Sequence, residues 1–280
     1  MKKILVIGIN GMAGHVIFKY LQEKNTNKVF GLARNIEPTE SIFNLDVSDT
    51  VELIKIINSY NFDFIINCVG ILNKDAEDHP EKAIWFNSYF PHFLESITKD
   101  TNSKVISIST DCVFSGKNGN YIETDKKDGE GFYAVSKALG EIVNYKDLTI
   151  RTSIIGPELK KDGIGLFNWV LNQTGDINGF TNAYWSGITT LELAKFINKI
   201  TSESNFPNGL IHLTNNVKIN KYNLLQIIKE VFELNDIVIN ESGQYKVDKS
   251  FISTRNDVEI LSVTYREMIL EMKTWMIKNK

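Results

Sequence analysis

The chain has 280 residues, of which 42% are hydrophobic and 23% charged, and its formal net charge is −3 at pH 7. This length suffices for one large domain or two coupled domains, and the composition is that of an ordinary soluble globular protein. The weak negative charge excludes a surface that would gather nucleic acid or anionic lipid, so we expect neither a nucleic-acid partner nor a membrane partner.

Cysteine usage and the start of the chain bear on the compartment. Cys68 and Cys112 are the two cysteines, which excludes a disulfide framework and favours a reducing compartment. The first residues resemble a signal peptide only superficially, because their apolar run stops after Ile9 and no small-residue cleavage site follows. No later stretch is long enough to span a bilayer. We therefore predict a cytoplasmic protein.

Short β-rich runs alternate with helical stretches through the first part of the chain. The predicted strands are 4–9, 28–33, 64–69, 104–109 and 148–154. The predicted helices include 12–21, 51–60, 83–98 and 133–145. Strands separated by such crossovers predict an α/β fold with a doubly wound parallel sheet, the Rossmann arrangement.

The regular alternation of predicted strands and helices ends after Gly156-Pro157. Short segments follow at 164–173 and 191–202, separated by a turn-rich stretch around 175–179. Beyond them we predict a strand over 209–213 and helices over 221–234 and 262–279. We predict a dinucleotide-binding domain over 1–157, to which 191–213 contribute a helix and a strand. A smaller α/β substrate-binding domain is predicted over 158–280, packed against the carboxyl edge of the sheet.

Three glycines directly after the first predicted strand indicate a dinucleotide site. Gly8, Gly11 and Gly14 allow a tight turn and close backbone approach, and the helix after them offers free N–H groups to phosphates. Asn10 and Met12 lie within the same turn. The alternative is a glycine turn in an ordinary βα unit. The position between the first strand and the first helix favours the dinucleotide site.

The ends of the next strands supply further candidate cofactor residues. Arg34 follows the second predicted strand, where an NAD site would usually carry an acidic residue, and its guanidinium suits a 2′-phosphate. We therefore predict NADPH, with NADH as the second option. The remaining cofactor candidates close two later apolar runs: Asp46, Val47, Cys68, Val69 and Gly70.

A tyrosine four residues before a lysine on a helix can act as a proton donor, because the ammonium lowers the pKa of the phenol. Three pairs have this spacing: Tyr20/Lys24, Tyr133/Lys137 and Tyr245/Lys249. The first ends the opening helix and the third lies in a segment predicted to be turn-rich. The pair at 133 and 137 begins a predicted helix after the strand that ends Ser109-Thr110. Thr110 could there hydrogen-bond a substrate carbonyl that Tyr133 also touches.

These motifs resemble those of the extended short-chain dehydrogenases/reductases, most of all the dTDP-4-dehydrorhamnose reductase family. The resemblance rests on the glycine turn, on 109–116 (STDCVFSG), on 133–141 (YAVSKALGE), and on the later segments 209–215, 221–222 and 250–257. It implies a nucleotide-sugar substrate for surface polysaccharide precursors, namely a 4-dehydro-6-deoxyhexose whose 4-keto group is reduced by hydride from NADPH. It further implies a catalytic triad of Thr110, Tyr133 and Lys137, a cofactor contact from Ser109, and a sugar pocket along Asp111, Cys112, Val113 and Phe114.

Cys112 departs from the family pattern, which usually has tyrosine at this position. Related dehydratases place a glutamate there, so the cysteine argues against a dehydratase. GDP-fucose synthases place a cysteine there as a base, which leaves a bifunctional epimerase/reductase as an alternative. That reaction needs a second acid/base, and His15, His79, His92 and His212 offer no convincing one. A non-catalytic NADP-sensing protein is the alternative from another class.

Candidate substrate contacts lie in the second part of the chain. The stretch 179–190, predicted to be a loop, is rich in aromatic and small polar residues, so Trp185 or Tyr184 could stack on the sugar or base and Asn182 could bond hydroxyls. Arg255 suits the substrate diphosphate. A core tryptophan and a surface salt bridge are the alternative interpretations. We assign no metal ligand, and the nucleotide, the sugar and the oligomeric state stay open, with a homodimer as one option.

Overall fold

The computed structural model describes residues 1–160, 163–259 and 261–279. Its contacts divide the chain into two compact units. The first unit comprises 1–109, 130–150 and 194–210, and the second comprises 110–129, 151–193 and 211–280. The predicted boundary at 157 differs from this division in two respects. Residues 110–129, which follow the fifth strand, group with the second unit, and the chain passes between the units several times.

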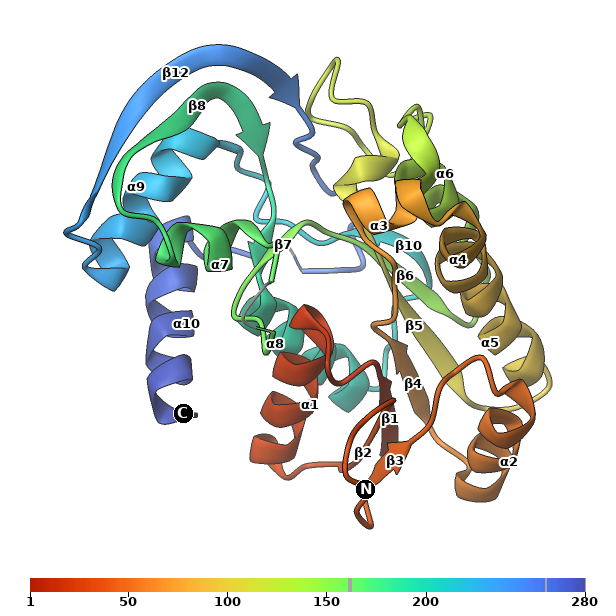
Figure 1. Cartoon of the computed structure of the whole chain (residues 1–280). Helices are drawn as coiled ribbons and strands as arrows, with labels where there is room; N and C mark the ends of the chain where they lie inside the picture. The colour runs from red at the N-terminus through yellow and green to blue at the C-terminus, as the bar shows by residue number, and fades with distance from the viewer. Residues whose placement is uncertain (161–162, 260, 280) are drawn as a thin grey trace. The chain divides into compact units, whose positions relative to one another are not determined.

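Within the described residues, the first unit is built on a seven-stranded sheet of order β10-β6-β5-β4-β1-β2-β3 (Figure 1). Its strands are β1 (Lys3–Ile7), β2 (Lys28–Ala33), β3 (Ile42–Asn44), β4 (Phe64–Asn67), β5 (Lys104–Ser109), β6 (Leu148–Arg151) and β10 (Gly209–His212). The pairs β1–β2, β1–β4, β2–β3 and β4–β5 are parallel. The predicted Rossmann-like α/β fold is confirmed.

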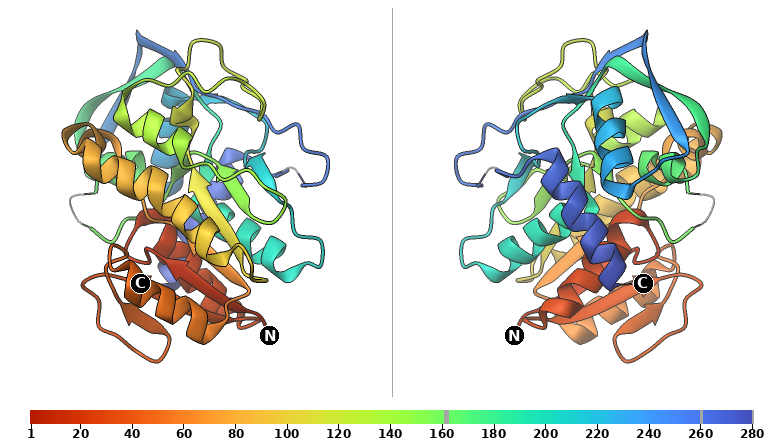
Figure 2. Two further views of the ribbon diagram at one scale, coloured as in Figure 1. Left: turned by 90° about the vertical axis from the view of Figure 1, so that its right-hand side faces the viewer. Right: turned by 90° about the vertical axis from the view of Figure 1, so that its left-hand side faces the viewer.

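Helices cover both faces of this sheet. They are α1 (Met12–Lys24), α2 (Thr50–Tyr60), α3 (Asn73–Asp78), α4 (Pro80–Ala83), the π-helical η1 (Ile84–Tyr89), α5 (Phe90–Thr98), α6 (Gly131–Leu139) and α8 (Thr190–Ser202). α1 and α8 lie on one face, and α2 and α5 on the other (Figure 1). The left-hand view of Figure 2 shows the helices of residues 80–98, orange to yellow, in front of the strands. No helix among the described residues combines the length and apolarity that a membrane crossing requires.

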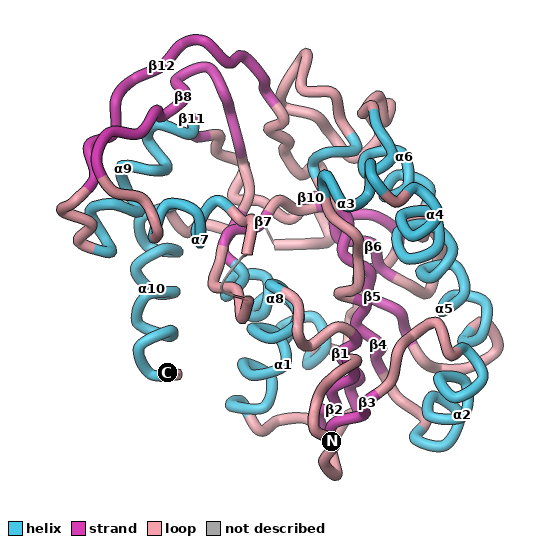
Figure 3. Tube along the Cα trace, in the orientation of Figure 1, coloured by secondary structure: helices cyan, strands magenta, loops and turns pink. Residues whose placement is uncertain are grey.

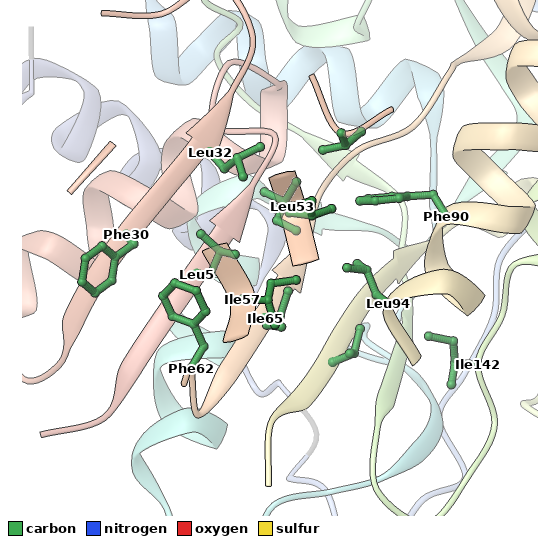
Figure 4. Packing of buried hydrophobic residues seen from close by; sticks show 13 residues of the cluster. Leu5, Phe30, Leu32, Leu53, Ile57, Phe62, Ile65, Phe90, Leu94 and Ile142 are labelled. Atoms are coloured by element: carbon green, nitrogen blue, oxygen red, sulfur yellow. The ribbon is translucent and has the colours of Figure 1, made fainter. Parts of the chain in front are cut away.

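The hydrophobic core of the first unit lies between the sheet and the α2/α5 layer. Leu5 and Leu32 from the sheet and Leu53 from α2 are fully buried there (Figure 4). Phe30 makes edge contacts with Tyr60 and Phe62, at ring-centroid distances of 5.0 and 5.5 Å. Each such side chain stabilises the fold by roughly 1.5–3 kcal/mol relative to an exposed one. This packing holds the carboxyl ends of β1, β4 and β5 in fixed positions.

The second unit is built on a three-stranded sheet of order β11-β8-β12. β8 (Gly175–Trp185) and β12 (Ile237–Asp248) form a long parallel pair, which is prominent in Figure 3, and β11 (Ile219–Asn220) pairs with the end of β8. α9 (Lys221–Phe232) packs on β8 and β12, and α10 (Tyr265–Lys278) packs on α9. The other elements are η2 (Asp111–Val113), β7 (Ile154–Ile155), α7 (Leu166–Leu171) and β9 (Ile188–Thr189).

Several predicted elements were wrong in kind or in extent. The turn-rich stretch at 175–179 and most of the loop at 179–190 form β8, where alternate residues from Ile177 to Trp185 are buried. The helix predicted over 133–145 ends at Leu139. A Cβ on Gly140 would lie 1.8 Å from the carbonyl oxygen of Asn87, so close packing against η1 stops the helix there.

Other differences concern where strands and helices end. β1 ends at Ile7 because Gly8 has φ +90°, and β4 ends at Asn67. The strand predicted over 148–154 ends at Arg151, and Ile154–Ile155 pair with β9 in a separate two-stranded sheet. The helix predicted over 83–98 contains the π-helical turn η1. β3 and β12 were not predicted.

Glu123 joins two distant segments of the second unit. Its carboxylate accepts hydrogen bonds from the backbone N–H and hydroxyl of Thr254, at 3.0 and 2.8 Å. It also accepts from the hydroxyl of Ser253 at 2.8 Å and from the backbone N–H of His212 at 3.1 Å. Burial opposes its ionisation, but these donors outweigh burial and lower the pKa of Glu123 to about 2.

We expect Glu123→Gln to lower the stability of the protein at pH 7 by about 1–2 kcal/mol, after allowance for solvent screening. Because the folded-state pKa lies below the value of 4.5 of an unperturbed glutamate, the carboxylate stabilises the fold above about pH 4.5. That contribution is lost as the pH falls from there towards 2. Denaturant unfolding between pH 3 and pH 7 should therefore show the two proteins converging at acid pH. The exposed Glu241 serves as the matched control, and an equal loss in Glu241→Gln would contradict the assignment.

Candidate active site

The turn between β1 and α1 is built for close backbone approach. Gly8 has φ +90°, a conformation that side chains disfavour, and its carbonyl oxygen accepts from the N–H of Gly11 at 2.9 Å. A Cβ on Gly14 would lie 2.1 Å from the Gly8 carbonyl oxygen, so only glycine lets α1 start there. Beside Gly11 the nearest atom to an added Cβ is 3.3 Å away. The amino end of α1 thus fits the pyrophosphate of a dinucleotide.

This turn lies where the strand order reverses. β1 pairs with β2 on one side and with β4 on the other, so the chain builds the sheet outwards in both directions from this point. Ligands of doubly wound sheets bind at the carboxyl ends of the strands beside such a reversal. Cys68, Val69 and Gly70 follow β4 directly, and Cys68 donates its backbone N–H to the carbonyl of Ile7 at 3.0 Å. The predicted cofactor residues after β1 and β4 are therefore neighbours.

The structure also brings together the two candidates for the adenosine end. Arg34, directly after β2, pairs with Asp46, its Nη1 lying 3.3 Å from the carboxylate Oδ2. The side chain of Asn10 donates to the backbone carbonyl of Arg34 at 3.1 Å. The backbone N–H and the hydroxyl of Ser48, with Arg34, lower the pKa of Asp46. The Arg34 side chain is 69% exposed, and an exposed pair is weak enough to exchange for a phosphate.

Lys137 on α6 is a half-buried cation anchored to the end of β5. Its ammonium donates to the carbonyl oxygen of Ile108 at 2.6 Å. Burial lowers its pKa to about 8, and the charge of Glu141 opposes that effect. Glu141 also accepts from the hydroxyl of Ser109 at 2.8 Å. The thiol of Cys68 lies near this ammonium, but burial raises its pKa to about 12, so the thiol is neutral.

Tyr133 lies one turn before Lys137 on the same helix, as predicted, and is half-buried. The start of this helix has no side-chain cap from its own N-cap residue, Glu130. Glu77 of α3 fills that role, accepting from the backbone N–H groups of Phe132 and Tyr133 at 3.0 and 3.1 Å. Sequence reasoning missed Glu77, because a cap that comes from 55 residues away carries no local signal.

Asn87 in the π-helical η1 is the second residue that sequence reasoning missed. Its side chain accepts from the backbone N–H of Ile71 and donates to the carbonyl of the same residue, both at 2.9 Å. It also donates to the hydroxyl of Ser136 on α6 at 3.1 Å. A Cβ on Gly70 would lie 3.2 Å from its Oδ1. Asn87 therefore ties the loop after β4 to the helix that carries Tyr133. The π-helical turn itself is a local irregularity often found at functional sites.

Thr110, the residue after β5, belongs to the second unit, as do the predicted sugar contacts. Its hydroxyl donates to the carboxylate of Asp111 at 3.1 Å and accepts from the backbone N–H of Cys112 at 3.2 Å. Burial, and then the charge of Asp111, raise the pKa of Cys112 to about 11, and Lys249 opposes them. The ammonium of Lys221 interacts with both Asp111 and Cys112.

The other predicted substrate residues are dispersed within the second unit. Val113 and Phe114 are buried, and Phe114 stacks on Tyr121 at 4.2 Å. Trp185 is 3% exposed, which agrees with the core alternative. Asn182 on β8 donates to the carbonyl of Gly243, and Arg255 forms a bidentate pair with Asp257. Their assignments to the substrate stay predictions.

The two other Tyr/Lys pairs differ from Tyr133/Lys137 in their local structure. Lys24 lies over the ring of Tyr20 at 4.9 Å, a cation–π contact at the carboxyl end of α1. Tyr245 lies on strand β12 rather than in a turn, so the helical spacing does not apply to it. Among the described residues, no group of three His, Cys, Asp or Glu side chains could hold a metal ion.

Residues 1–248 match the family model described as the RmlD substrate binding domain. A probable low-salt glycan biosynthesis reductase of Haloferax volcanii is 32% identical over 158 residues, which are 54% of this chain and 52% of the relative. The methionine adenosyltransferase 2 subunit beta of Bos taurus is 28% identical over 141 residues, 50% of this chain and 42% of the relative. The matched region thus spans about half the length of these curated relatives.

Solved structures share the fold over nearly the whole chain. A hypothetical dTDP-4-dehydrorhamnose reductase from Sulfolobus tokodaii has 26% identity and a TM-score of 0.74, with 90% of this chain and 92% of that chain covered. The dTDP-4-dehydrorhamnose reductase of Bacillus anthracis, solved in complex with NADP, has 18% identity and a TM-score of 0.78, with both chains fully covered. At 18% identity, the second likeness concerns the fold alone.

We expect Glu77→Ala to loosen the start of α6 and to destabilise the protein by about 1 kcal/mol, the usual cost of a lost N-terminal cap. Hydrogen exchange followed by NMR should show faster exchange of the amides of Phe132 and Tyr133, the two groups that the carboxylate accepts from. Glu81→Ala, on the neighbouring α4, should leave both amides unchanged. Unaltered protection of these amides in Glu77→Ala would show that the cap is not formed.

Proposed function

The chain belongs to the RmlD substrate binding domain family, and from that premise we propose that it is an NADPH-dependent oxidoreductase. Its proposed substrate is a nucleotide-linked 4-dehydro-6-deoxyhexose, whose 4-keto group it reduces. The observation that carries the proposal is the anchoring of Lys137 at the end of β5, one helical turn from Tyr133. An ammonium in that place can lower the pKa of a neighbouring phenol, as a proton-donating tyrosine requires.

The first unit offers the residues that would hold the cofactor. Backbone N–H groups of Met12 and Gly14 would bind the pyrophosphate where Gly11 leaves room for its approach, and Arg34 would pair with the 2′-phosphate. The loop from Cys68 to Gly70, with Ser109, would line the rest of the dinucleotide. When bound, NADPH supplies the hydride for the ketone carbon. The glycine turn supports this assignment, since side chains at Gly8 or Gly14 would block the approach of backbone or phosphate.

The proton chemistry falls to three residues of this chain. Tyr133 donates its phenolic proton to the oxygen that becomes an alkoxide when the ketone is reduced. Lys137 keeps the phenol acidic through its charge and bonds the nicotinamide ribose. Thr110, which follows β5 directly in the chain, holds the same substrate oxygen with its hydroxyl. The resemblance of the family motifs and the placement of Lys137 support these roles.

The biological setting proposed is the supply of precursors for surface polysaccharides. The Haloferax volcanii relative carries the name of a glycan biosynthesis reductase, and the Sulfolobus tokodaii structure that of a dTDP-4-dehydrorhamnose reductase. Both names concern reduction, and the first concerns glycan assembly. Location in the cytoplasm and assembly into a homodimer remain predictions of the sequence.

A second candidate function is a non-catalytic NADP-binding subunit. It is favoured by the similarity to the methionine adenosyltransferase 2 subunit beta, a protein named as one subunit of a larger enzyme. A subunit of this kind needs the glycine turn but has no use for a buried Lys137 beside Tyr133. Turnover separates the two candidates, because only the reductase oxidises NADPH.

We expect Arg34→Ala to weaken NADPH binding by about tenfold or more, because a charge-assisted contact to the 2′-phosphate is lost. NADH has no such phosphate, so its affinity should stay unchanged. Fluorescence titration of both nucleotides measures the two affinities. As a control, the exposed Lys28 at the start of β2 can be replaced by alanine, which should change neither. If Arg34→Ala weakened the affinities for NADPH and NADH equally, the assignment of the guanidinium to the 2′-phosphate would be contradicted.

We expect Tyr133→Phe to fold and bind NADPH normally but to lose turnover by about 10²–10⁴-fold, the usual contribution of a general acid. The measurement is NADPH absorbance at 340 nm, with 4-keto-6-deoxyhexoses linked to dTDP, UDP, GDP and CDP offered in turn. Tyr145→Phe, at an exposed position, is the matched control with full activity. Wild-type turnover in Tyr133→Phe would overturn the catalytic assignment. NADPH binding by the wild type without oxidation of NADPH by any of these sugars would instead favour the subunit.

A further inference from the structure

Lys221 begins α9 in the second unit, directly after the short strand β11. The N-cap residue Asn220 accepts from the backbone N–H of Asn223 at 2.8 Å, and it pairs with Tyr184 of β8. These contacts fix the backbone beside Lys221. A lysine in the first turn of a helix is electrostatically unfavourable, because the amino end of a helix carries partial positive charge. An interaction of its side chain must therefore favour a lysine at this position.

The ammonium of Lys221 faces a small group of chemically distinct side chains, which we name the Lys221 cluster: Asp111, Cys112, Trp185 and Lys221. It lies 4.9 Å from the centre of the Trp185 ring. Asp111 and Cys112 both act on its charge. Lys221 is half-buried, and its partial burial lowers the pKa of the ammonium to about 8. All four residues belong to the second unit.

The ammonium of Lys221 differs from those of other partly buried lysines because it has no hydrogen-bond acceptor within the described ranges of the chain. Lys137 donates to the carbonyl of Ile108, and Lys146 donates to the carbonyls of Thr98 and Ser103, both at 2.8 Å. In the part of the chain that the structure describes, no oxygen accepts a hydrogen bond from Nζ of Lys221. The side chain is half-buried, and the described residues leave the hydrogen-bonding capacity of its ammonium unused, so a ligand that binds beside it can supply the acceptor.

We propose that Lys221 is a substrate-binding residue that donates a hydrogen bond to an oxygen of the sugar moiety, beside Asp111 and Cys112. The assignment rests on the proposed function, because it takes the substrate to be a nucleotide sugar. Thr110, assigned to the keto oxygen, donates to Asp111 at 3.1 Å, which places the cluster next to the reacting group along the chain. An ammonium donor beside a carboxylate acceptor suits a polyhydroxylated ring, and the buried Trp185 ring holds the ammonium in place through its cation–π contact.

The alternative within the same substrate is an oxygen of the diphosphate. The carboxylate of Asp111, 7% exposed and close to the ammonium, disfavours a doubly charged group, whereas it can accept from a sugar hydroxyl. The geometry therefore assigns Lys221 to the sugar, and the two cases can be told apart by a nucleoside diphosphate that lacks the sugar.

The test is Lys221→Met, which keeps the length of the side chain and removes the charge. Calorimetric titration should use the dTDP-, UDP- and GDP-linked 4-keto-6-deoxyhexoses, and dTDP, UDP and GDP alone. We expect affinity for the sugar bound by the wild type to fall by about tenfold or more, with the matching nucleoside diphosphate and NADPH unchanged. We also expect a melting temperature equal to or above that of the wild type, since the substitution removes a partly buried charge.

Lys273→Met is the matched control, because Lys273 also lies over an aromatic ring, that of Phe232 at 5.9 Å. It should leave sugar affinity unchanged. Sugar affinity within twofold of the wild type in Lys221→Met overturns the inference and leaves the proposed function standing. If the affinity for the nucleoside diphosphate alone falls equally, Lys221 contacts the diphosphate, and the assignment to the sugar is overturned. A wild-type protein that binds none of these three sugars and does not bind the CDP-linked sugar refutes the proposed function, and the inference falls with it.

Discussion

The ammonium of the half-buried Lys137 is the group on whose contacts the organisation of the first unit depends. An ammonium that is partly removed from solvent is stabilised by acceptors and by a balancing charge, without which it would deprotonate more readily. The carbonyl of Ile108 provides the acceptor and Glu141 the charge. To meet these demands α6 has to lie against the end of β5, and Gly140 allows this by ending the helix where its backbone meets η1. Core packing and charge burial thus require the same arrangement.

Local features of the sequence predicted the first unit well. The glycine turn, β2, β5 and the beginning of α2 depend on neighbours within a few residues, and periodicity or spacing reveals them. Glu77 and Asn87 were missed because they act across 55 and 49 residues, where a single sequence carries no trace of the contact. β8 was misjudged for another reason. Its glycine, asparagine and threonine content indicates turns, but the alternating burial of its residues comes from pairing with β12, 60 residues later.

The two half-buried lysines assigned to the proposed reaction have different environments, although partial burial brings the pKa of each to about 8. Lys137 has its acceptor within the protein, so its position is already determined before any ligand binds. Lys221 has a carboxylate and a thiol nearby but no acceptor among the described residues, so its hydrogen bonds are completed from outside. Lys137 is therefore suited to position a neighbouring group, whereas Lys221 is suited to bind a ligand. The same shift in acidity therefore reports two different tasks.

The state of Cys112 bears on the choice between reduction alone and epimerisation before reduction. A thiol that removes a proton from carbon must ionise near neutral pH, but burial and the charge of Asp111 raise the pKa of Cys112 to about 11. His212, the one buried histidine of the second unit, cannot serve as the second acid/base. Its Nε2 accepts from the guanidinium of Arg151 at 3.1 Å and its Nδ1 donates to the carbonyl of Ile252 at 3.0 Å. With both ring nitrogens engaged and the thiol neutral, simple reduction is the chemistry that these side chains favour.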